Sequence, residues 1–216
     1  VKPKLILTVP PYANFLKRLA RDPDVKQHVN GFRLNTVMQL KRDEDKVDLL
    51  KRMADELDQP RLWIDLKARQ LRTAEFCVPP FAGIRLTQRI KCAVPSTAYF
   101  KDGTEKATIE QVDGDMLIMR DGPRRVVGPG ESINIPDGNL EVEGFFTDTD
   151  LEYADAAWKA FHTSTDRNPH FMVSFVETKD DLRLIDDRLG LGAHVLLKIE
   201  SKKGVDFVKS QPKLGR

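Results

Sequence analysis

The sequence predicts a mixed α/β protein with a small β-rich domain inserted into it. Residues 1–74 and 137–216 alternate short apolar runs with amphipathic segments, which is the pattern of strands and helices around a parallel sheet. Between them, residues 75–136 place prolines, glycines and Asp-Gly pairs between short apolar pieces, which is typical of antiparallel hairpins. We therefore expect three consecutive segments: a first α/β part, a β insert and a second α/β part.

Strands and helices alternate along the first part. Asn14 begins an amphipathic segment that Asp22-Pro23 is expected to end. Asp43 is a candidate cap for a longer helix, whose apolar residues between Val47 and Leu57 recur at the spacing of a single helix face. The three strands expected here are residues 5–9, 32–35 and 61–66.

The second part repeats this alternation. Residues 149–161 are predicted to be helical because their apolar positions fall on one side. Thr178 is expected to start a further helix and Gly190 to end it, and residues 204–210 would open another. The two strands expected here are residues 171–176 and 195–199.

The middle segment shows hairpin signals. Its Asp-Gly pairs stand between short, partly alternating apolar pieces, of which 107–112 and 116–120 are the clearest. We expect a small all-β domain. The three Asp-Gly pairs are at Asp102-Gly103, Asp113-Gly114 and Asp121-Gly122.

Composition argues against a nucleic-acid-binding protein and against a membrane-spanning protein. A net charge of +2 over 216 residues argues against a dedicated nucleic-acid surface. No apolar run reaches membrane-spanning length, so we expect no membrane partner. Cys77 and Cys92 have no metal-binding spacing; a disulfide between them stays open, but a reducing, cytoplasmic setting is the simpler expectation.

Lys198 and Glu200 form the most informative local pattern. They end the apolar run that begins at His194, and alternation along a strand places side chains two residues apart on one face. The carboxyl end of a barrel strand is where catalytic groups lie. A carboxylate there suits a hard metal ion, and an ammonium suits a phosphate or a developing enolate.

Several short motifs, in order along the chain, resemble the pyruvate kinase family. The motif Lys198-Ile199-Glu200 followed by Gly204-Val205 looks like that family's active-site strand. Each match is short, but together they cover most of the chain. The other matching segments are 4–11, 31–35, 65–67 with 71–73, 99–103, 132–136 and 172–176.

The resemblance implies a fold and an activity. It implies a partial (β/α)8 TIM-type barrel of about five strands, with the small β domain inserted after the third strand as a lid. The activity implied is magnesium-dependent transfer of a phosphoryl group between phosphoenolpyruvate and ADP. The three remaining barrel strands have no counterpart here, so we expect a homo-oligomer or a partner chain that completes the barrel.

The resemblance also assigns roles to individual residues. Lys198 would be the cation near the phosphoryl group and the enolate, and Arg33 would bind phosphate. Glu200 would hold magnesium. The remaining assignments are phosphate or nucleotide contacts at Lys67, Arg72 and Asp102, and potassium ligands at Asn35 and Asp65.

Four departures from the family pattern leave alternatives open. Val37 and Leu66 replace oxygen donors, Ala68-Arg69 replaces Gly-Pro, and Glu177 replaces an Arg. Potassium dependence is therefore open. So are a non-catalytic protein that binds phosphate ligands or regulates, a structural subunit whose sheet edges a partner covers, and a different metal-dependent barrel enzyme acting on a keto acid.

Overall fold

The chain forms two compact units in the computed structural model. The structure describes residues 4–38, 40, 45–57, 62–79, 83–136, 139–162 and 168–211, so Asp43 and Arg61 lie outside the described part. Residues 1–68 and 148–216 form one unit, here called the sheet unit. Residues 69–147 form the other, here called the insert unit, and the predicted insert lies within it.

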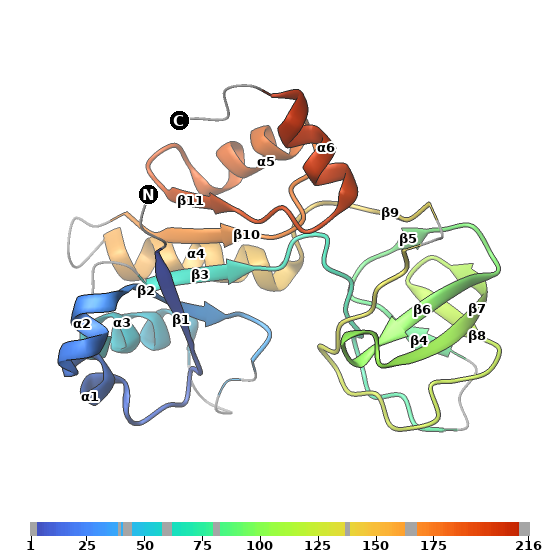
Figure 1. Ribbon diagram of the computed structural model, residues 1–216, viewed down its shortest axis with the longest axis horizontal. Helices are drawn as coiled ribbons and strands as arrows, with labels where there is room; N and C mark the ends of the chain where they lie inside the picture. Colours follow the sequence, from blue (N-terminus) through green and yellow to red (C-terminus); the bar gives the residue numbers. More distant parts are fainter. Residues whose placement is uncertain are drawn as a thin grey trace. The chain divides into compact units, whose positions relative to one another are not determined.

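The sheet unit contains a parallel sheet of five described strands (Figure 1). Every neighbouring pair of strands is parallel, and the order of the strands in space follows their order in the chain. The predicted parallel sheet, interrupted after its third strand, is therefore confirmed. The strands in order are β1 (Leu5–Val9), β2 (Val29–Asn35), β3 (Leu62–Leu66), β10 (His170–Val173) and β11 (His194–Leu197).

Helices alternate with these strands, and α3, α4 and α5 each bury a set of apolar residues. The predicted face of α3 is buried from Leu49 to Leu57, whereas Val47 in the first turn is only partly buried, and α3 packs against α4. Thr178 and Asp181 form a capping box at the start of α5, and Gly190 caps its end with a φ of 79°. The helices are α1 (Leu16–Arg21), α2 (Pro23–His28), α3 (Lys46–Leu57), α4 (Asp148–His162), α5 (Lys179–Leu189) and α6 (Lys202–Ser210).

Asp22-Pro23 ends α1, as predicted, and Asp22 also begins the next helix. Helix α1 ends at Arg21 with Asp22 as its C-cap, and Asp22 is at the same time the N-cap of α2, with Pro23 in its first turn. The Asp22 carboxylate accepts a hydrogen bond from the backbone N–H of Asp24 at 2.9 Å. Proline is well tolerated at this position, because a first-turn N–H has no partner within the helix.

Strand β10 is shorter than predicted. It ends at Val173 instead of Val176, and Phe175 adopts a positive φ of 53°, which a continuing strand cannot accommodate. The backbone stays attached to its neighbours beyond the strand, since Ser174 N–H donates to the carbonyl of Leu66 at 3.2 Å. Ser174 is thereby held just past the carboxyl end of the sheet.

The insert unit is built on antiparallel strands around its own apolar core. Asp102-Gly103 lies in a short 3-10 turn, η1 (Lys101–Gly103), that joins two paired strands, and Asp113-Gly114 joins the next pair, as predicted. Buried residues such as Ile84, Phe100 and Ile109 form the core. A four-stranded sheet runs β4 (Gly83–Arg85), β8 (Met116–Met119), β7 (Glu105–Asp113), β6 (Ser96–Phe100), and β5 (Ile90–Lys91) pairs with β9 (Glu141–Val142).

The third Asp-Gly pair is not a hairpin turn. The Asp121 carboxylate accepts hydrogen bonds from the backbone N–H and the hydroxyl of Thr108, at 2.7 and 3.1 Å. These bonds anchor the chain to β7 after β8 has ended, and the next described strand begins only at Glu141. The hairpin expectation for Asp121-Gly122 was therefore wrong.

Two expectations drawn from composition can be compared with the structure. Cys77 and Cys92 are both free thiols, so the disulfide left open by the sequence is not formed. None of the described helices combines the length and the apolar character needed to cross a membrane.

Candidate functional site

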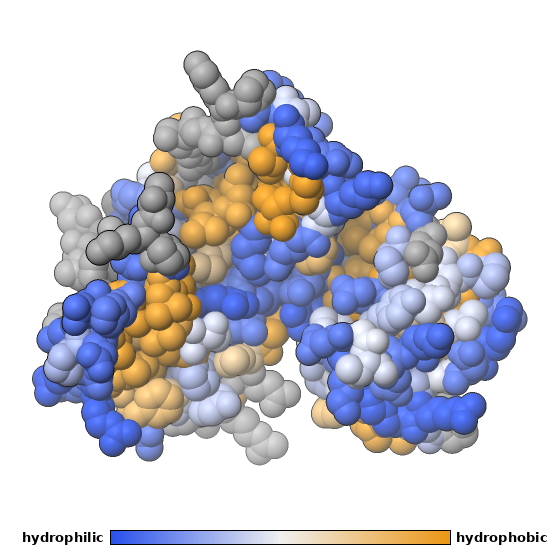
Figure 2. All heavy atoms as spheres, in the orientation of Figure 1, coloured by the Kyte–Doolittle hydropathy of each residue, from blue (hydrophilic) through white to orange (hydrophobic). Residues whose placement is uncertain are grey.

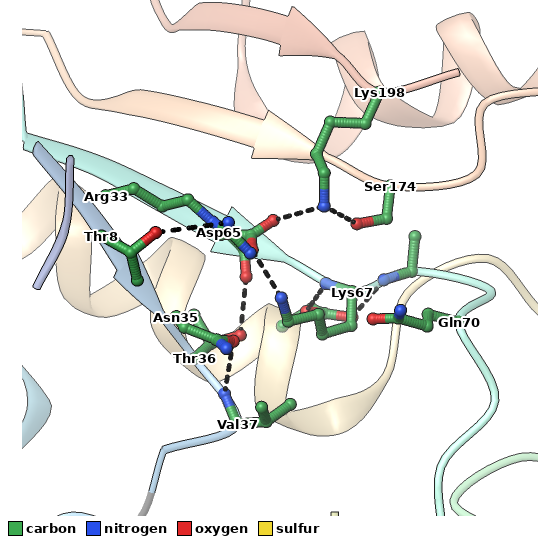
Figure 3. Close-up of polar contacts among 12 residues, drawn as sticks. Thr8, Arg33, Asn35, Thr36, Val37, Asp65, Lys67, Gln70, Ser174 and Lys198 are labelled. Carbon is green, nitrogen blue, oxygen red and sulfur yellow. Dashed lines mark hydrogen bonds and ion pairs between the residues drawn. The ribbon is translucent and has the colours of Figure 1, made fainter. Parts of the chain in front are cut away.

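The candidate site lies at the carboxyl ends of the parallel strands, where side chains from all five strands or their exits meet (Figure 3). Arg33 comes from β2 and Asp65 from β3, and the two residues are near neighbours in the register of these strands. Lys67 follows β3, and Lys198 follows β11. All of these residues belong to the sheet unit.

Asp65 is the centre of the cluster. Its side chain is completely buried, and a buried carboxylate needs charge partners and hydrogen-bond donors to remain ionised. Its Oδ2 accepts from Nε of Arg33 at 2.8 Å and from Nζ of Lys67 at 2.5 Å. Its Oδ1 accepts from Nζ of Lys198 at 3.0 Å. One carboxylate thus holds three cationic side chains.

The three cations differ in their access to solvent. The side chain of Lys67 is 5% exposed, that of Lys198 is 19% exposed and that of Arg33 is 30% exposed. Arg33 and Lys198 are therefore the groups that a ligand in solution can reach. Lys67 faces the buried carboxylate and serves mainly to balance its charge.

The shifted pKa values follow from this arrangement. Burial alone would raise the pKa of Asp65, but the charge and hydrogen bond of Lys67, with the charges of the other two cations, leave it below its usual range. Burial lowers the pKa of Lys67 to about 8, because attraction by Asp65 only partly offsets desolvation and repulsion from the neighbouring cations. Asp65 and Lys67 are thus both ionised at neutral pH.

Further residues fix the reactive side chains in place. Lys198 also donates to Oγ of Ser174 at 2.8 Å, and Arg33 donates from Nη1 to Oγ1 of Thr8 at 3.4 Å. The hydroxyl of Thr36 donates to the backbone carbonyl of Asp65 at 2.8 Å. The positions of both accessible cations are therefore set by hydrogen bonds from neighbouring strands.

Asp150 anchors the backbone at the end of β3. It lies buried in the first turn of α4, and its carboxylate accepts from the N–H groups of Lys67 and Ala68 at 2.7 and 3.0 Å. Ala68 has a positive φ of 46°, an uncommon conformation for a non-glycine residue. Asp150 thus stabilises the turn from which Lys67 projects.

Glu200 lies beside Lys198, with Oε1 3.4 Å from Nζ, although β11 ends at Leu197 and both residues lie beyond the strand that was predicted to carry Lys198. Its side chain is 33% exposed. The carboxylate therefore keeps lone pairs for another cation, which fits a single protein ligand to magnesium held mainly by substrate phosphate oxygens. No group of three possible metal-ligating residues occurs within the described part of the chain.

The potassium ligands implied by the resemblance, Asn35 and Asp65, make hydrogen bonds within the protein, and their potassium-binding roles stay predictions. Both carboxylate oxygens of Asp65 already accept from cations. Oδ1 of Asn35 accepts from the backbone N–H of Val37 at 3.4 Å. The oxygen atoms that the resemblance would offer to potassium are thus engaged within the protein.

Two predicted residues belong to the insert unit. Arg72 donates to the backbone carbonyl of Gly130 and, at 2.7 Å, to Oε1 of Gln70. Asp102 is exposed in η1 with a positive φ of 54°. The phosphate-binding roles of Arg72 and Asp102 stay predictions.

Sequence reasoning missed several members of the site. Ser174 was considered only as part of a strand, and Asp150 only as part of a helix. Asp65 was considered as an ion ligand instead of a partner for side-chain cations. One signal was available for the last: Asp65 and Lys67 are two residues apart, the same spacing that identified Lys198 and Glu200.

Comparison with known proteins adds no family assignment, because no family model matches the chain and no curated protein matches it in sequence.

Proposed function

We propose that this chain is a pyruvate kinase-type phosphotransferase, or a part of one, which moves a phosphoryl group between phosphoenolpyruvate and ADP. The observation that carries the proposal is the meeting of Arg33 and Lys198 on the buried carboxylate of Asp65, at the carboxyl ends of parallel strands. These are the residues to which the sequence resemblance gives the phosphate and enolate roles.

The topology supports a section of a (β/α)8 barrel. The five strands occupy consecutive positions in the order of the chain, without the reversal that marks a doubly wound sheet. Both outer strands are incompletely buried: Leu5 of β1 is 50% exposed and Leu196 of β11 is 38% exposed. Figure 2 shows apolar residues gathered over both of these strands. Further strands, from a continuing chain or from a partner, would cover them.

The accessible cations account for the chemistry. Arg33 would hold the phosphate, since a planar guanidinium with several N–H donors matches phosphate oxygens. When the phosphoryl group passes to the terminal phosphate oxygen of ADP, the electrons of the broken P–O bond stay on the enolate oxygen. Lys198 would stabilise that charge at a preorganised position, because Ser174 and Asp65 already fix its ammonium.

Magnesium and the insert unit complete the proposal. Glu200 would be one ligand of a magnesium ion, which when bound would neutralise charge on the phosphate oxygens. The lid role of the insert unit and the nucleotide contacts of Arg72 and Asp102 belong to this proposal through the sequence resemblance alone.

The test is ATP formation from phosphoenolpyruvate and ADP, followed in a coupled assay with magnesium. Lys198→Ala is expected to lower kcat by roughly 10²–10³-fold, the usual effect of removing a preorganised charge-stabilising group. Lys209→Ala is the matched control, because Lys209 is an exposed lysine in the last turn of α6. Turnover that survives Lys198→Ala would refute the assignment of Lys198.

A second candidate is a non-catalytic protein that binds a phosphate ligand. It is favoured by Glu177, which stands where the family has an Arg and accepts from Oγ of Ser201 at 2.5 Å. A carboxylate near the carboxyl ends of the strands lowers the local positive charge and so weakens the attraction of a polyanionic nucleotide. Calorimetric binding of phosphoenolpyruvate without any ATP formation would favour this candidate. A related alternative, a structural subunit, predicts that a partner chain covers the sheet edges. Measuring the mass of the protein in solution would detect that partner.

A further inference from the structure

We propose that Glu200 is a tethered competitor for the ammonium of Lys198, so that the site binds a free anion weakly and an anion complexed with a divalent cation more tightly. The proposal rests on the anion site of the proposed function, but it does not require turnover. It follows from the number of N–H groups on Lys198 and from the acceptors around them.

The ammonium of Lys198 has one N–H left for a ligand. An ammonium carries three N–H donors. One of them donates to Oδ1 of Asp65 at 3.0 Å and another to Oγ of Ser174 at 2.8 Å. Both acceptors belong to fully buried residues, so an anion from solution does not replace them readily. The anion must therefore use the third N–H.

Glu200 is the third acceptor beside this nitrogen. Its Oε1 lies 3.4 Å from Nζ of Lys198, which is longer than a strong charge-assisted hydrogen bond. Its side chain is 33% exposed, and within the described part of the chain Lys198 is its only polar partner. An anion can therefore displace the Glu200 carboxylate from Lys198. The displaced carboxylate still lies close to the anion and repels it.

The backbone that carries Glu200 is held on both sides of this residue. The backbone N–H of Val176 donates to the carbonyl of Lys198 at 3.4 Å. On the other side, Oγ of Ser201 accepts from the backbone N–H of Gly204 at 3.0 Å and so fixes the start of α6. Glu200 thus stays near Lys198 even when its side chain rotates, so it competes at a high local concentration.

Arg33 offers an anion two N–H groups without such competition. A guanidinium has five N–H donors. In the described part of the chain, Nε and Nη2 of Arg33 contact Asp65 at 2.8 and 2.5 Å, and Nη1 donates to Thr8 at 3.4 Å. Two N–H groups therefore remain for a ligand. A free anion can bind Arg33 at once, but it reaches Lys198 only by displacing Glu200.

A divalent cation on the anion removes this conflict. The anion can then take the third N–H of Lys198 while the displaced carboxylate of Glu200 binds the cation, because magnesium accepts a single carboxylate together with phosphate oxygens. Glu200 thereby changes from a competitor into a ligand. The residue would determine which form of the anion the site selects.

The test measures the binding of inorganic phosphate to the whole chain by titration calorimetry at neutral pH and low ionic strength. Without a divalent cation, Glu200→Gln is expected to bind phosphate at least about fivefold more tightly than the wild type, because a partly exposed negative charge beside the ligand is lost. Glu200→Asp keeps the charge on a shorter side chain and should have an intermediate affinity. Equal affinities of the wild type and Glu200→Gln would overturn the proposal.

Magnesium provides the converse test. In the wild type, magnesium should tighten phosphate binding by at least about fivefold, since Glu200 then binds the cation instead of repelling the anion. In Glu200→Gln, magnesium should change the affinity by less than about twofold, because the amide carries no charge. Magnesium that tightens binding equally in both proteins would overturn the proposal, because Glu200 would then not distinguish a free anion from a complexed one.

Glu152→Gln is the matched control. It removes the same charge from another Glu–Lys ion pair of the sheet unit, in which Glu152 lies 2.6 Å from Lys46. Both substitutions nearly keep the side-chain volume at partly or fully exposed positions, so both variants are expected to fold. Phosphate affinity of Glu152→Gln should stay within about twofold of the wild type. An increase as large as that of Glu200→Gln would assign the effect to net charge and overturn the proposal.

The outcomes separate this proposal from the proposed function. A protein that shows the expected phosphate affinities but forms no ATP from phosphoenolpyruvate would contradict the proposed function and support the role of Glu200. A protein that binds no phosphate, either as wild type or as Glu200→Gln, would overturn both, because the anion site itself would be absent.

Discussion

The ammonium of Lys198 lies 3.0 Å from Oδ1 of Asp65, although 133 residues separate the two in the chain. The parallel sheet produces this contact, because β10 lies between β3 and β11 and aligns the carboxyl ends of all three strands. Ser174, just beyond β10, is uncharged, and its hydroxyl oxygen accepts a hydrogen bond from the same ammonium at 2.8 Å. The position of the accessible lysine is thus determined by three neighbouring strands.

Replacing Asp65 should destabilise the protein strongly. Asp65→Asn leaves Arg33, Lys67 and Lys198 without their shared anion, and breaking a buried ion pair typically costs about 3–5 kcal/mol. Urea denaturation measures the loss. Asp155→Asn is the control, since Asp155 pairs with Arg188 at an exposed position and should change stability by less than about 1 kcal/mol. Equal effects of the two variants would contradict the central role of Asp65.

Removing the Asp150 carboxylate should loosen the turn that carries Lys67. In Asp150→Ala, the buried N–H groups of Lys67 and Ala68 lose their acceptor, at about 1–3 kcal/mol for each. Chemical denaturation and amide hydrogen exchange at these two residues check the result. Asp45→Ala is a suitable comparison, because exposed Asp45 accepts from Val47 N–H at the start of α3 and should cost about 1 kcal/mol.

A methyl group at Gly204 should disturb the segment that holds Glu200. A Cβ there would lie 2.7 Å from the carbonyl oxygen of Val176, which is backbone and cannot turn away. We expect Gly204→Ala to cost about 1–3 kcal/mol in thermal unfolding, as overpacking does. Gly192→Ala, whose new Cβ would meet its nearest neighbour at an ordinary 3.5 Å, should be far milder. A neutral Gly204→Ala would show that α6 is not packed against Val176.

Anion affinity should decrease as the pH rises through about 8. The pKa of Lys67 is lowered to about 8 by burial, so this lysine loses its proton, and the cluster one positive charge, well below the usual range for lysine. Sulfate is the suitable probe, because it keeps its charge between pH 7 and about 9. Titration calorimetry should show weaker binding at the higher pH in the wild type. Lys67→Met should bind more weakly but without this step, and an identical step in that variant would assign the proton elsewhere.

Local patterns made much of the fold predictable. The apolar face of α3, the capping box from Thr178 to Asp181 and the glycine cap at Gly190 are short-range features, which neighbouring residues specify largely by themselves. Asp102-Gly103 and Asp113-Gly114 likewise specify their turns. The misread Asp121-Gly122 pair arose from local ambiguity. Asp121 accepts a hydrogen bond from a neighbouring strand instead of forming a hairpin turn, whereas Asp22-Pro23 both ends α1, as predicted, and begins α2.

The charged cluster was only partly predictable. The predicted proximity of the Lys198 and Glu200 side chains is confirmed, but both residues follow the end of β11 at Leu197, so strand alternation does not account for it. Spacing alone could not predict that Asp65 contacts three cations. Two of them, Arg33 and Lys198, come from segments that are far from Asp65 in the sequence. The positive φ of Phe175, which releases Ser174 from the strand, depends on packing that no short sequence motif announces.

The hydrogen bonds from Lys67 and Ala68 to Asp150 affect how the inserted segment can change during evolution. They join the point where the chain leaves the sheet unit to the point where it returns, 82 or 83 residues later. The two ends of the inserted segment are therefore held together by hydrogen bonds within the sheet unit. Because its ends are fixed, the inserted segment can change in length or be replaced during evolution while the residues around Asp65 keep their positions.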